Sequence, residues 1–259
     1  MTGRIYSLIR KNGRAENQDY LFYEKKKFND NEEMTVFGIC DGMGGMEQGG
    51  QLSRLTAWTF GAYFSQKIVP FLAKENAVIP KRKEIREILE NTMESVQRTI
   101  AAYIKKHRIS GGSTLTAGVI CKNSLHVVNA GDSPCYLIDM KNDAVILVSN
   151  VENYAYEGLA KGIFTNKKSP EFERASSYLT NYIGAKDFRK PEAHSYQIFP
   201  GNRVLAGSDG LFGNLDEEEI LTAAKDLPEE KSLERIARRS VSMGETDNQS
   251  GVLWVWKNR

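Results

Sequence analysis

The stretch 83–105 restricts the fold more than any other part of this sequence, because its apolar residues recur at intervals of three and four along the whole segment. This spacing predicts an amphipathic helix on the order of 30 Å long with one apolar stripe. A helix of this kind must bury its stripe against a broad surface, for which a β-sheet is the natural candidate. The stripe consists of Ile85, Ile88, Leu89, Val96, Ile100, Tyr103 and Ile104.

Strand-like segments lie on both sides of this helix in the sequence. Three of them precede a second helical stretch at 51–71, and the polar residues 25–33 are expected to form a hairpin loop. After Gly111 and Gly112, four short apolar runs with polar joints predict an antiparallel meander. The early runs are 4–10, 19–24 and 34–40, and the later ones are 114–121, 124–131, 135–140 and 144–149.

The remaining residues predict an insertion followed by a second group of helices. Residues 150–192 are polar and irregular, and we expect them to leave the core as a flap-like excursion. Asp216 and Glu219 have capping-box spacing and mark the start of a short helix. The order of elements predicts an α+β layered architecture in one domain, 1–259. This order is strands, two long helices, strands, two short helices and a final strand. The late strands are expected at 194–199, 203–209 and 251–257, and a further helix near 232–243.

The charge and the cysteines exclude several classes of protein. Lys and Arg total 35 against 33 for Asp and Glu, and this net charge of +2 argues against nucleic acid or an anionic membrane as the main partner. Cys40, Cys121 and Cys135 form no CxxC pair and lie in apolar runs, which predicts reduced core thiols in a cytosolic protein. No apolar run approaches the roughly 20 residues that span a bilayer, and no signal peptide is evident, so we expect a cytoplasmic location.

Aspartates recur at the ends of the predicted strands. Asp41 follows VFGIC, Asp132 follows VVNAG and Asp209 follows VLAGS, while Asp19 and Asp247 each precede a strand. One such residue beside glycine is usually a turn former, because its side chain bonds the nearby backbone. Five that converged at sheet edges would repel one another unless cations lay among them. Both interpretations fit a single aspartate, and the number of aspartates favours a metal site.

The ligand type at these positions selects the metal. The side chains offer oxygen and no suitably spaced His or Cys, which favours Mg²⁺ or Mn²⁺ over zinc. Gly42 could add its backbone carbonyl, since it has no side chain to crowd an ion. Two such ions can share a hydroxide, lower its pKa and hold a phosphate oxygen in line with it. Hydrolysis of a phosphoester is the reaction that this arrangement suits best.

Several of these aspartates belong to longer motifs. In order along the chain come RAENQD, ICDGMGGMEQGG, GGSTLTAGVI, VVNAGDSPCYLI, LAGSDGLFGNL and GETDNQSGVLWV. This order resembles the PPM, or type 2C, metal-dependent serine/threonine protein phosphatases of bacterial type, over about residues 14–256. The resemblance implies a four-layer sandwich, in which two central antiparallel β-sheets are flanked by pairs of antiparallel α-helices. It also implies a phosphorylated protein substrate, with a cognate serine/threonine kinase or its targets as partners.

Carried over position by position, the resemblance gives the metal ligands separate roles. Asp41 would bridge two Mn²⁺ or Mg²⁺ ions, and Gly42 would give its carbonyl to one of them. Asp209 and Asp247 would complete the shell of that ion. Asp19 would bind the other ion through water.

Two further residues have counterparts in part of the family. Asp132 would hold a weaker third ion, as in bacterial-type members. Arg14 matches the arginine that clamps the substrate phosphate in some members, and a solvated loop arginine is an equally good interpretation of it.

The chain departs from the family pattern around the expected site. Met43 stands where other members have a His proposed to protonate the leaving alkoxide, so we expect that proton to come from metal-bound water. His107, His126 and His194 match no catalytic position. The family's usual GDSR motif reads GDSP here, because Pro134 stands in place of the arginine. The segment VSNVENYA stands where the family usually has an acidic residue followed by His and Ser. A pseudophosphatase that binds a partner through the flap, or an enzyme for small phosphoesters, remains open, but the retained aspartates favour an active protein phosphatase.

Overall fold

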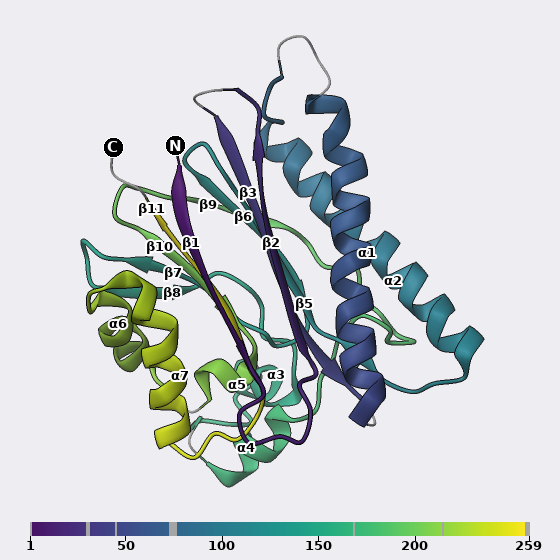
Figure 1. Cartoon of the computed structure of the whole chain (residues 1–259). Helices are drawn as coiled ribbons and strands as arrows, with labels where there is room; N and C mark the ends of the chain where they lie inside the picture. The colour runs from purple at the N-terminus through teal and green to yellow at the C-terminus, as the bar shows by residue number, and fades with distance from the viewer. Residues whose placement is uncertain are drawn as a thin grey trace.

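The computed structural model describes residues 2–29, 32–44, 46–72, 77–167, 169–213 and 215–256. Two β-sheets lie face to face, and neighbouring strands in both run antiparallel (Figure 1). The first sheet contains β1 (Gly3–Arg10), β11 (Gln249–Trp256), β10 (Arg203–Gly207), β7 (Cys135–Asp139) and β8 (Ala144–Leu147), in that spatial order. The second contains β2 (Asp19–Lys27), β3 (Glu33–Met43), β5 (Leu115–Cys121), β6 (Ser124–Ala130) and β9 (His194–Gln197), with β4 (Gly112–Ser113) beside β3.

Helices cover the outer face of each sheet. α1 (Met46–Leu72) and α2 (Arg82–His107) pack on the second sheet, and α6 (Glu217–Lys225) and α7 (Ser232–Ser242) pack on the first (Figure 1). The predicted α+β four-layer sandwich, with helix pairs flanking two antiparallel sheets, is therefore confirmed. None of the helices in the described ranges is both long and apolar enough to pass through a membrane.

The predicted helix at 83–105 corresponds to α2, and its apolar stripe is buried as expected. Ile85, Leu89 and Ile100 are 1% exposed or less and belong to the core between the helices and the second sheet. In β3, Val36 faces this core, whereas the next residue, Phe37, faces the core between the two sheets. This alternation has the period of two of a β-strand, so the second sheet is buried on both faces.

The four strands predicted as one meander belong to two different sheets, which corrects that prediction. β5 pairs with β6 in the second sheet, whereas β7 pairs with β8 in the first. The chain crosses between the sheets at 131–134, and we call this segment the crossing. Gly131 has a φ of 114° there, a conformation open to glycine, and a Cβ at this position would lie 2.7 Å from the Cβ of Thr114. Asp132 therefore lies in a connection between the sheets and not in a hairpin turn.

Several element boundaries also differ from the predicted ones. β2 continues to Lys27, into residues expected to be loop, and α1 begins before the expected position 51. β10 ends at Gly207, and Asp209 opens a short helix, α5 (Asp209–Phe212). The capping box is confirmed, because the Asp216 carboxylate accepts the Glu219 N–H at 3.0 Å and the Asp216 N–H donates to the Glu219 carboxylate at 3.1 Å.

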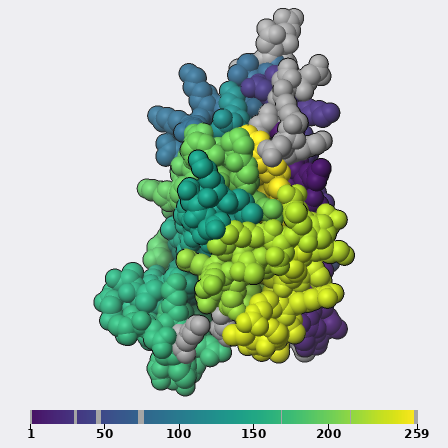
Figure 2. Space-filling view, turned by 90° about the vertical axis from the view of Figure 1, so that its left-hand side faces the viewer, coloured from purple at the N-terminus to yellow at the C-terminus, as the bar shows by residue number. Residues whose placement is uncertain are grey.

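The stretch 150–192 contains α3 (Tyr154–Ala160) and α4 (Pro170–Ser176), which form a lobe that projects from the sandwich (Figure 2). The lobe is tied to the crossing at its start. The Glu152 N–H donates to the Gly131 carbonyl at 3.1 Å, and the Gly131 N–H donates to the Glu152 carboxylate at 3.1 Å. That this stretch is an insertion into a single domain stays a prediction.

Leu89→Ala tests the buried stripe of α2. The variant removes a fully buried side chain, so we expect the free energy of unfolding to fall by about 2–5 kcal/mol through lost burial and a new cavity. Lys106→Ala, on an exposed position of the same helix, should change it by less than about 0.5 kcal/mol. Urea denaturation followed by circular dichroism measures both values. Equal effects of the two substitutions would contradict the burial of this stripe.

Candidate metal centre

The pairing of β2 with β3 brings two predicted ligands together. Asp19 and Asp41 are directly opposite each other in this pair. Thr114 holds Asp41 on the other side, because the Asp41 N–H donates to Thr114 Oγ1 at 2.9 Å and its carbonyl accepts the Thr114 N–H at 2.8 Å. The Thr114 hydroxyl also hydrogen-bonds the Ser133 hydroxyl at 2.8 Å. The backbone of Asp41 is thereby linked through Thr114 to the crossing.

One carboxylate oxygen of Asp19 lacks a hydrogen-bond partner within the part of the chain that the structure describes. The residue is 5% exposed, and its Oδ2 accepts the Ser208 hydroxyl at 2.7 Å. Its Oδ1 is buried and has no hydrogen-bond partner among the described residues. Burial is the main cause that raises the pKa of Asp19 to about 7, with the charges of Asp209 and Asp247 adding to it. A buried, unpaired carboxylate oxygen is a position that a cation would stabilise.

Asp209 and Asp41 lie in direct contact through their carboxyl groups. The two side chains share a hydrogen bond, which requires a proton on one of them. Asp209 Oδ1 also accepts the Gly210 N–H at 2.7 Å at the start of α5. Desolvation of the carboxyl groups, followed by the charges of neighbouring carboxylates, raises the pKa of both groups, although Asp209 as a whole residue is exposed to solvent. A bound cation could replace this shared proton.

Asp132 sits in the crossing, where it is 8% exposed. Its Oδ2 accepts a hydrogen bond from Asn153 Nδ2 at 3.1 Å, and Asn153 Oδ1 accepts the Tyr156 N–H at 3.1 Å to cap α3. Burial raises the pKa of Asp132 to about 7, and the charge of Asp209 adds to this effect. Asp132 is therefore within electrostatic reach of the other acids.

Asp247 is held by the predicted phosphate clamp. Arg14 Nη2 donates to Asp247 Oδ2 at 2.6 Å, and the two side chains are 57% and 34% exposed. Glu245, which the sequence interpretation did not select, accepts the Asp247 N–H and the Thr246 N–H, both at 2.8 Å. Arg14 thus belongs to this group of residues, but in the described structure it contacts a predicted metal ligand.

Gly42 lies where the backbone is packed most closely. A Cβ at this position would lie 2.1 Å from the carbonyl oxygen of Gly49 and 2.8 Å from that of Gln18, so no larger residue fits. The Gly42 N–H donates to the Gln18 carbonyl at 3.1 Å. This confirms that the glycines of the loop permit a close approach of backbone segments, while the role of the Gly42 carbonyl as a ligand stays a prediction.

The chemistry of these donors fits Mg²⁺ or Mn²⁺. The side-chain donors are carboxylate oxygens, one buried oxygen lacks a protein partner, and the acids raise one another's pKa. Across the described ranges, no three His, Cys, Asp or Glu side chains are gathered closely enough to make a finished metal site. Serine, asparagine and arginine side chains hold three of the carboxylates instead. The assignment of individual ligands therefore stays a prediction.

Asn248 connects three backbone segments at this end of the molecule, and the sequence interpretation gave it no role. Its Oδ1 accepts the Gln18 N–H at 2.8 Å, and its Nδ2 donates to the carbonyls of Lys11 and Glu16 at 2.8 and 2.9 Å. The side chain is 4% exposed and uses both of its amide donors. Asn248 thereby fixes the loop that carries Arg14. Its place directly after Asp247 was the only signal in the sequence.

Sequence comparison gives matches along almost the whole chain. The family model described as protein phosphatase 2C matches residues 9–253. A putative protein phosphatase of Mycoplasma genitalium is 28% identical over 253 residues, which cover 93% of this chain and 90% of that protein. The serine/threonine phosphatase Stp of Listeria innocua is 24% identical over 236 residues, covering 89% of this chain and 88% of that protein.

Solved structures share the fold. The serine/threonine phosphatase of S. agalactiae superposes with a TM-score of 0.83 at 19% identity, over 99% of this chain and 100% of that one. The catalytic domain of the phosphatase PstP in complex with two manganese ions superposes with a TM-score of 0.74 at 20% identity, over 98% and 97%. Because the family model covers residues 9–253, this chain belongs to the protein phosphatase 2C family of serine/threonine phosphatases.

Proposed function

We propose that this protein is a Mg²⁺- or Mn²⁺-dependent phosphatase that removes phosphate from phosphoserine and phosphothreonine residues of proteins. The observation that carries the proposal is the group of acids supplied by β2, β3, the crossing and the start of α5, whose pKa values burial and mutual repulsion raise. Membership of the protein phosphatase 2C family supports the reaction class. The manganese-bound PstP supports the choice of metal.

The roles of the individual ligands are part of this proposal. Asp41 contacts Asp209 and is paired with Asp19, which suits a carboxylate that bridges two ions. When bound, the two ions supply a hydroxide nucleophile near neutral pH and neutralise charge on the phosphate. A third, weaker site would use Asp132. The proposed ligands are Asp19, Asp41, Gly42, Asp132, Asp209 and Asp247.

Arg14 is proposed to hold the phosphate group of the substrate. Its guanidinium is more than half exposed, and its fork of N–H donors matches two phosphate oxygens. It must leave Asp247 to do so, because the two are hydrogen-bonded in the described structure. Met43 has no proton to donate, so the proton for the leaving alkoxide is proposed to come from a water molecule at the metal centre.

A phosphorylated protein is the substrate in this proposal, and a cognate serine/threonine kinase or its targets are the expected partners in the cytoplasm. Tyr154 and Tyr178 are 60% and 65% exposed on the lobe that is tied to the crossing. Exposed aromatic side chains on this lobe favour a polypeptide substrate over a small phosphoester, because they can contact residues that flank the phosphorylated one.

Hydrolysis of a phosphothreonine peptide with Mn²⁺, compared with EDTA, tests the proposed reaction. We expect metal-dependent turnover, and we expect Asp209→Asn to lower kcat about 100-fold or more, because the nucleophile depends on the ions that this carboxylate would bind. Asp216→Asn is the matched control. It makes the same change at an exposed helix cap, where asparagine serves as well as aspartate, and should retain full activity.

Other outcomes of this assay would assign other functions. No turnover of any substrate, together with no tight Mn²⁺ site by calorimetry, would identify a partner-binding protein. Turnover of p-nitrophenyl phosphate and small phosphate esters, but not of the phosphopeptide, would identify a small-molecule phosphatase. Activity unchanged in Asp209→Asn would show that this residue is not a ligand.

Asp132→Asn should stabilise the metal-free protein at alkaline pH. The pKa of Asp132 in the folded protein is about 7, above its ordinary 3.8, so the folded state binds this proton more tightly than the unfolded state does. That contribution is fully present below pH 3.8 and is lost as pH rises through 7. Asparagine cannot ionise, so at pH 8 the variant should be more stable by on the order of 2 kcal/mol.

Thermal unfolding in EDTA measures this effect. The melting temperature of Asp132→Asn should exceed that of the wild type by several degrees at pH 8, and the difference should shrink toward pH 4. Asp187→Asn, at an exposed position, should leave the melting temperature unchanged. A wild type that is as stable as Asp132→Asn at pH 8 would contradict the raised pKa.

Asn248→Ala tests whether this residue positions Arg14. The variant loses all three of its hydrogen bonds to the backbone around Arg14. We expect KM for the phosphopeptide to rise about tenfold or more with a smaller change in kcat, because substrate phosphate is held less well. In an Arg14→Ala background, Asn248→Ala should add little to the loss. Fully additive losses would mean that Asn248 acts in another way.

A further inference from the structure

A cavity of about 490 Å³ lies at the end of the second sheet that is far from the acids. The first turn of α2, the turn between β5 and β6 and the strand β9 surround it, and α2 begins at the end of the molecule opposite α3 and α5 (Figure 1). β6 starts at this cavity with Ser124 and ends two residues before Asp132. A strand of 7 residues is roughly 20 Å long, so the cavity is separate from the metal centre.

The walls of this cavity carry positive charge, and the Glu84 carboxylate beside them accepts the Lys81 backbone N–H at 2.6 Å without pairing with a cationic side chain that lines the cavity. Lys81, Arg82 and Lys122 line it, and none of the lining residues in the described structure is acidic. None of these three forms an ion pair with another described residue, and Arg82 donates only to the neutral amide oxygen of Gln197. Cations gathered together without ion-pair partners make a site that attracts an anion.

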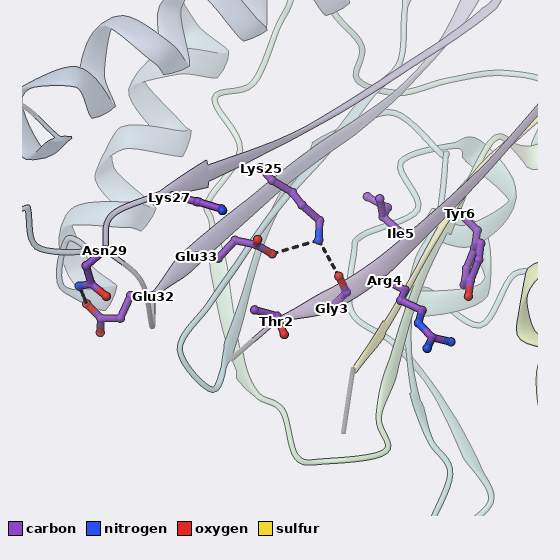
Figure 3. A pocket seen from close by; sticks show the side chains of 10 residues that line it. All are labelled: Thr2, Gly3, Arg4, Ile5, Tyr6, Lys25, Lys27, Asn29, Glu32 and Glu33. Carbon is purple, nitrogen blue, oxygen red and sulfur yellow. Dashed lines mark hydrogen bonds and ion pairs between the residues drawn. The ribbon is translucent and has the colours of Figure 1, made fainter. Parts of the chain in front are cut away.

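The cavity between β1 and β2 shows how different a compensated set of cations is. It has a volume of about 600 Å³ and also contains basic side chains (Figure 3). There, however, Lys25 Nζ lies 3.1 Å from a Glu33 carboxylate oxygen and donates to the Gly3 carbonyl at 2.6 Å. Glu32 lies in the same lining. Acids accompany the bases in this second cavity, so it needs no anionic ligand.

His126 places an unsatisfied polar atom at the cavity near α2. The residue is fully buried, and its neighbours Leu125 and Val127 face the core between the sheets, so its ring is on the α2 side. Nδ1 is 2.8 Å from the Ser195 hydroxyl. Nε2 is buried and lacks a hydrogen-bond partner within the described residues. Such an atom costs free energy unless a ligand or water satisfies it.

The charge state of His126 suits an acceptor in the cavity. Burial, followed by the positive charges of Arg82 and Arg86, lowers its pKa to about 4, so the ring is neutral at pH 7. If Nδ1 accepts the Ser195 hydroxyl proton, Nε2 carries an N–H that has no acceptor among the described residues. An anion would satisfy this donor and the cations together.

We propose that this cavity binds a small phosphate-bearing anion, held by Lys81, Arg82 and Lys122 above the His126 ring. Phosphate oxygens accept several charge-assisted hydrogen bonds at once, and the fork of an arginine matches two of them. Arg82 would exchange a neutral acceptor, Gln197, for a charged one. The His126 Nε2 atom is shielded from solvent, so an anion can reach it only if a neighbouring side chain moves. The shift of Arg82 away from Gln197 would provide this movement. The volume suits a ligand from inorganic phosphate up to a mononucleotide.

Nuclear magnetic resonance of the imidazole ring tests the proposal on the metal-free full chain. The chain has 3 histidines, so the double variant His107→Gln and His194→Gln leaves His126 as the source of every histidine signal. Inorganic phosphate, titrated against chloride at constant ionic strength, should shift these signals along a saturable curve. Adenosine monophosphate provides the second arm. Tighter binding than phosphate would show that a nucleoside occupies the rest of the cavity, and equal binding would show that the phosphate group alone is recognised.

Charge-removing substitutions decide where the anion binds. Arg82→Gln and Lys122→Gln should each weaken binding about tenfold or more, through the loss of a charge-assisted hydrogen bond. Lys83→Gln is the matched control, since Lys83 is 81% exposed in the same helical turn and lies near Glu87 instead of lining the cavity. No saturable shift, or equal binding by wild type, Arg82→Gln and Lys122→Gln, would overturn the proposal. Phosphatase activity should be unchanged in Arg82→Gln, so failure of this site is distinguishable from failure of the proposed enzyme.

Discussion

Carboxylate groups that are brought together and removed from water repel one another, and this repulsion is the constraint on which the rest of the structure depends. Asp19 and Asp132 are both buried, and Asp41 shares a hydrogen bond with Asp209. No local turn preference would gather them. The two packed cores on either side of the second sheet hold the strands in place and thereby hold the acids close. A cation satisfies the same constraint chemically, because it removes the cause of the repulsion.

The acids lie at or near the ends of strands, and several different local features fix their positions. Strand pairing sets Asp19 against Asp41, a helix start orients Asp209, and the crossing carries Asp132. One hydrogen bond, between the hydroxyls of Thr114 and Ser133, connects the segment that holds the Asp41 backbone to the crossing. The arrangement is therefore a property of the sandwich as a whole and not of a single loop.

Much of this fold follows from local patterns in the sequence. The stripe of α2, the strands and the capping box of Asp216 all depend on residues near one another in the chain, and these predictions were confirmed. The division of the later strands between two sheets was missed, because an apolar run looks the same before a hairpin and before a crossing. The contacts of Asn248 and Arg14 join segments more than 200 residues apart, which spacing along the chain cannot reveal. The sequence shows that His126 matches no catalytic position, but whether its Nε2 finds a partner among the described residues depends on the groups that α2 and β9 bring to it.

Asn153 gives the projecting lobe a mechanical connection to the acids. One end of its amide starts α3 and the other end holds Asp132, so a single planar group of fixed length joins the two. A displacement of α3 would either carry Asp132 with it or break one of these bonds. The position of the lobe and the surroundings of the buried Asp132 carboxylate are therefore coupled. Binding of another protein to the lobe would therefore alter the surroundings of Asp132 through the Asn153 side chain.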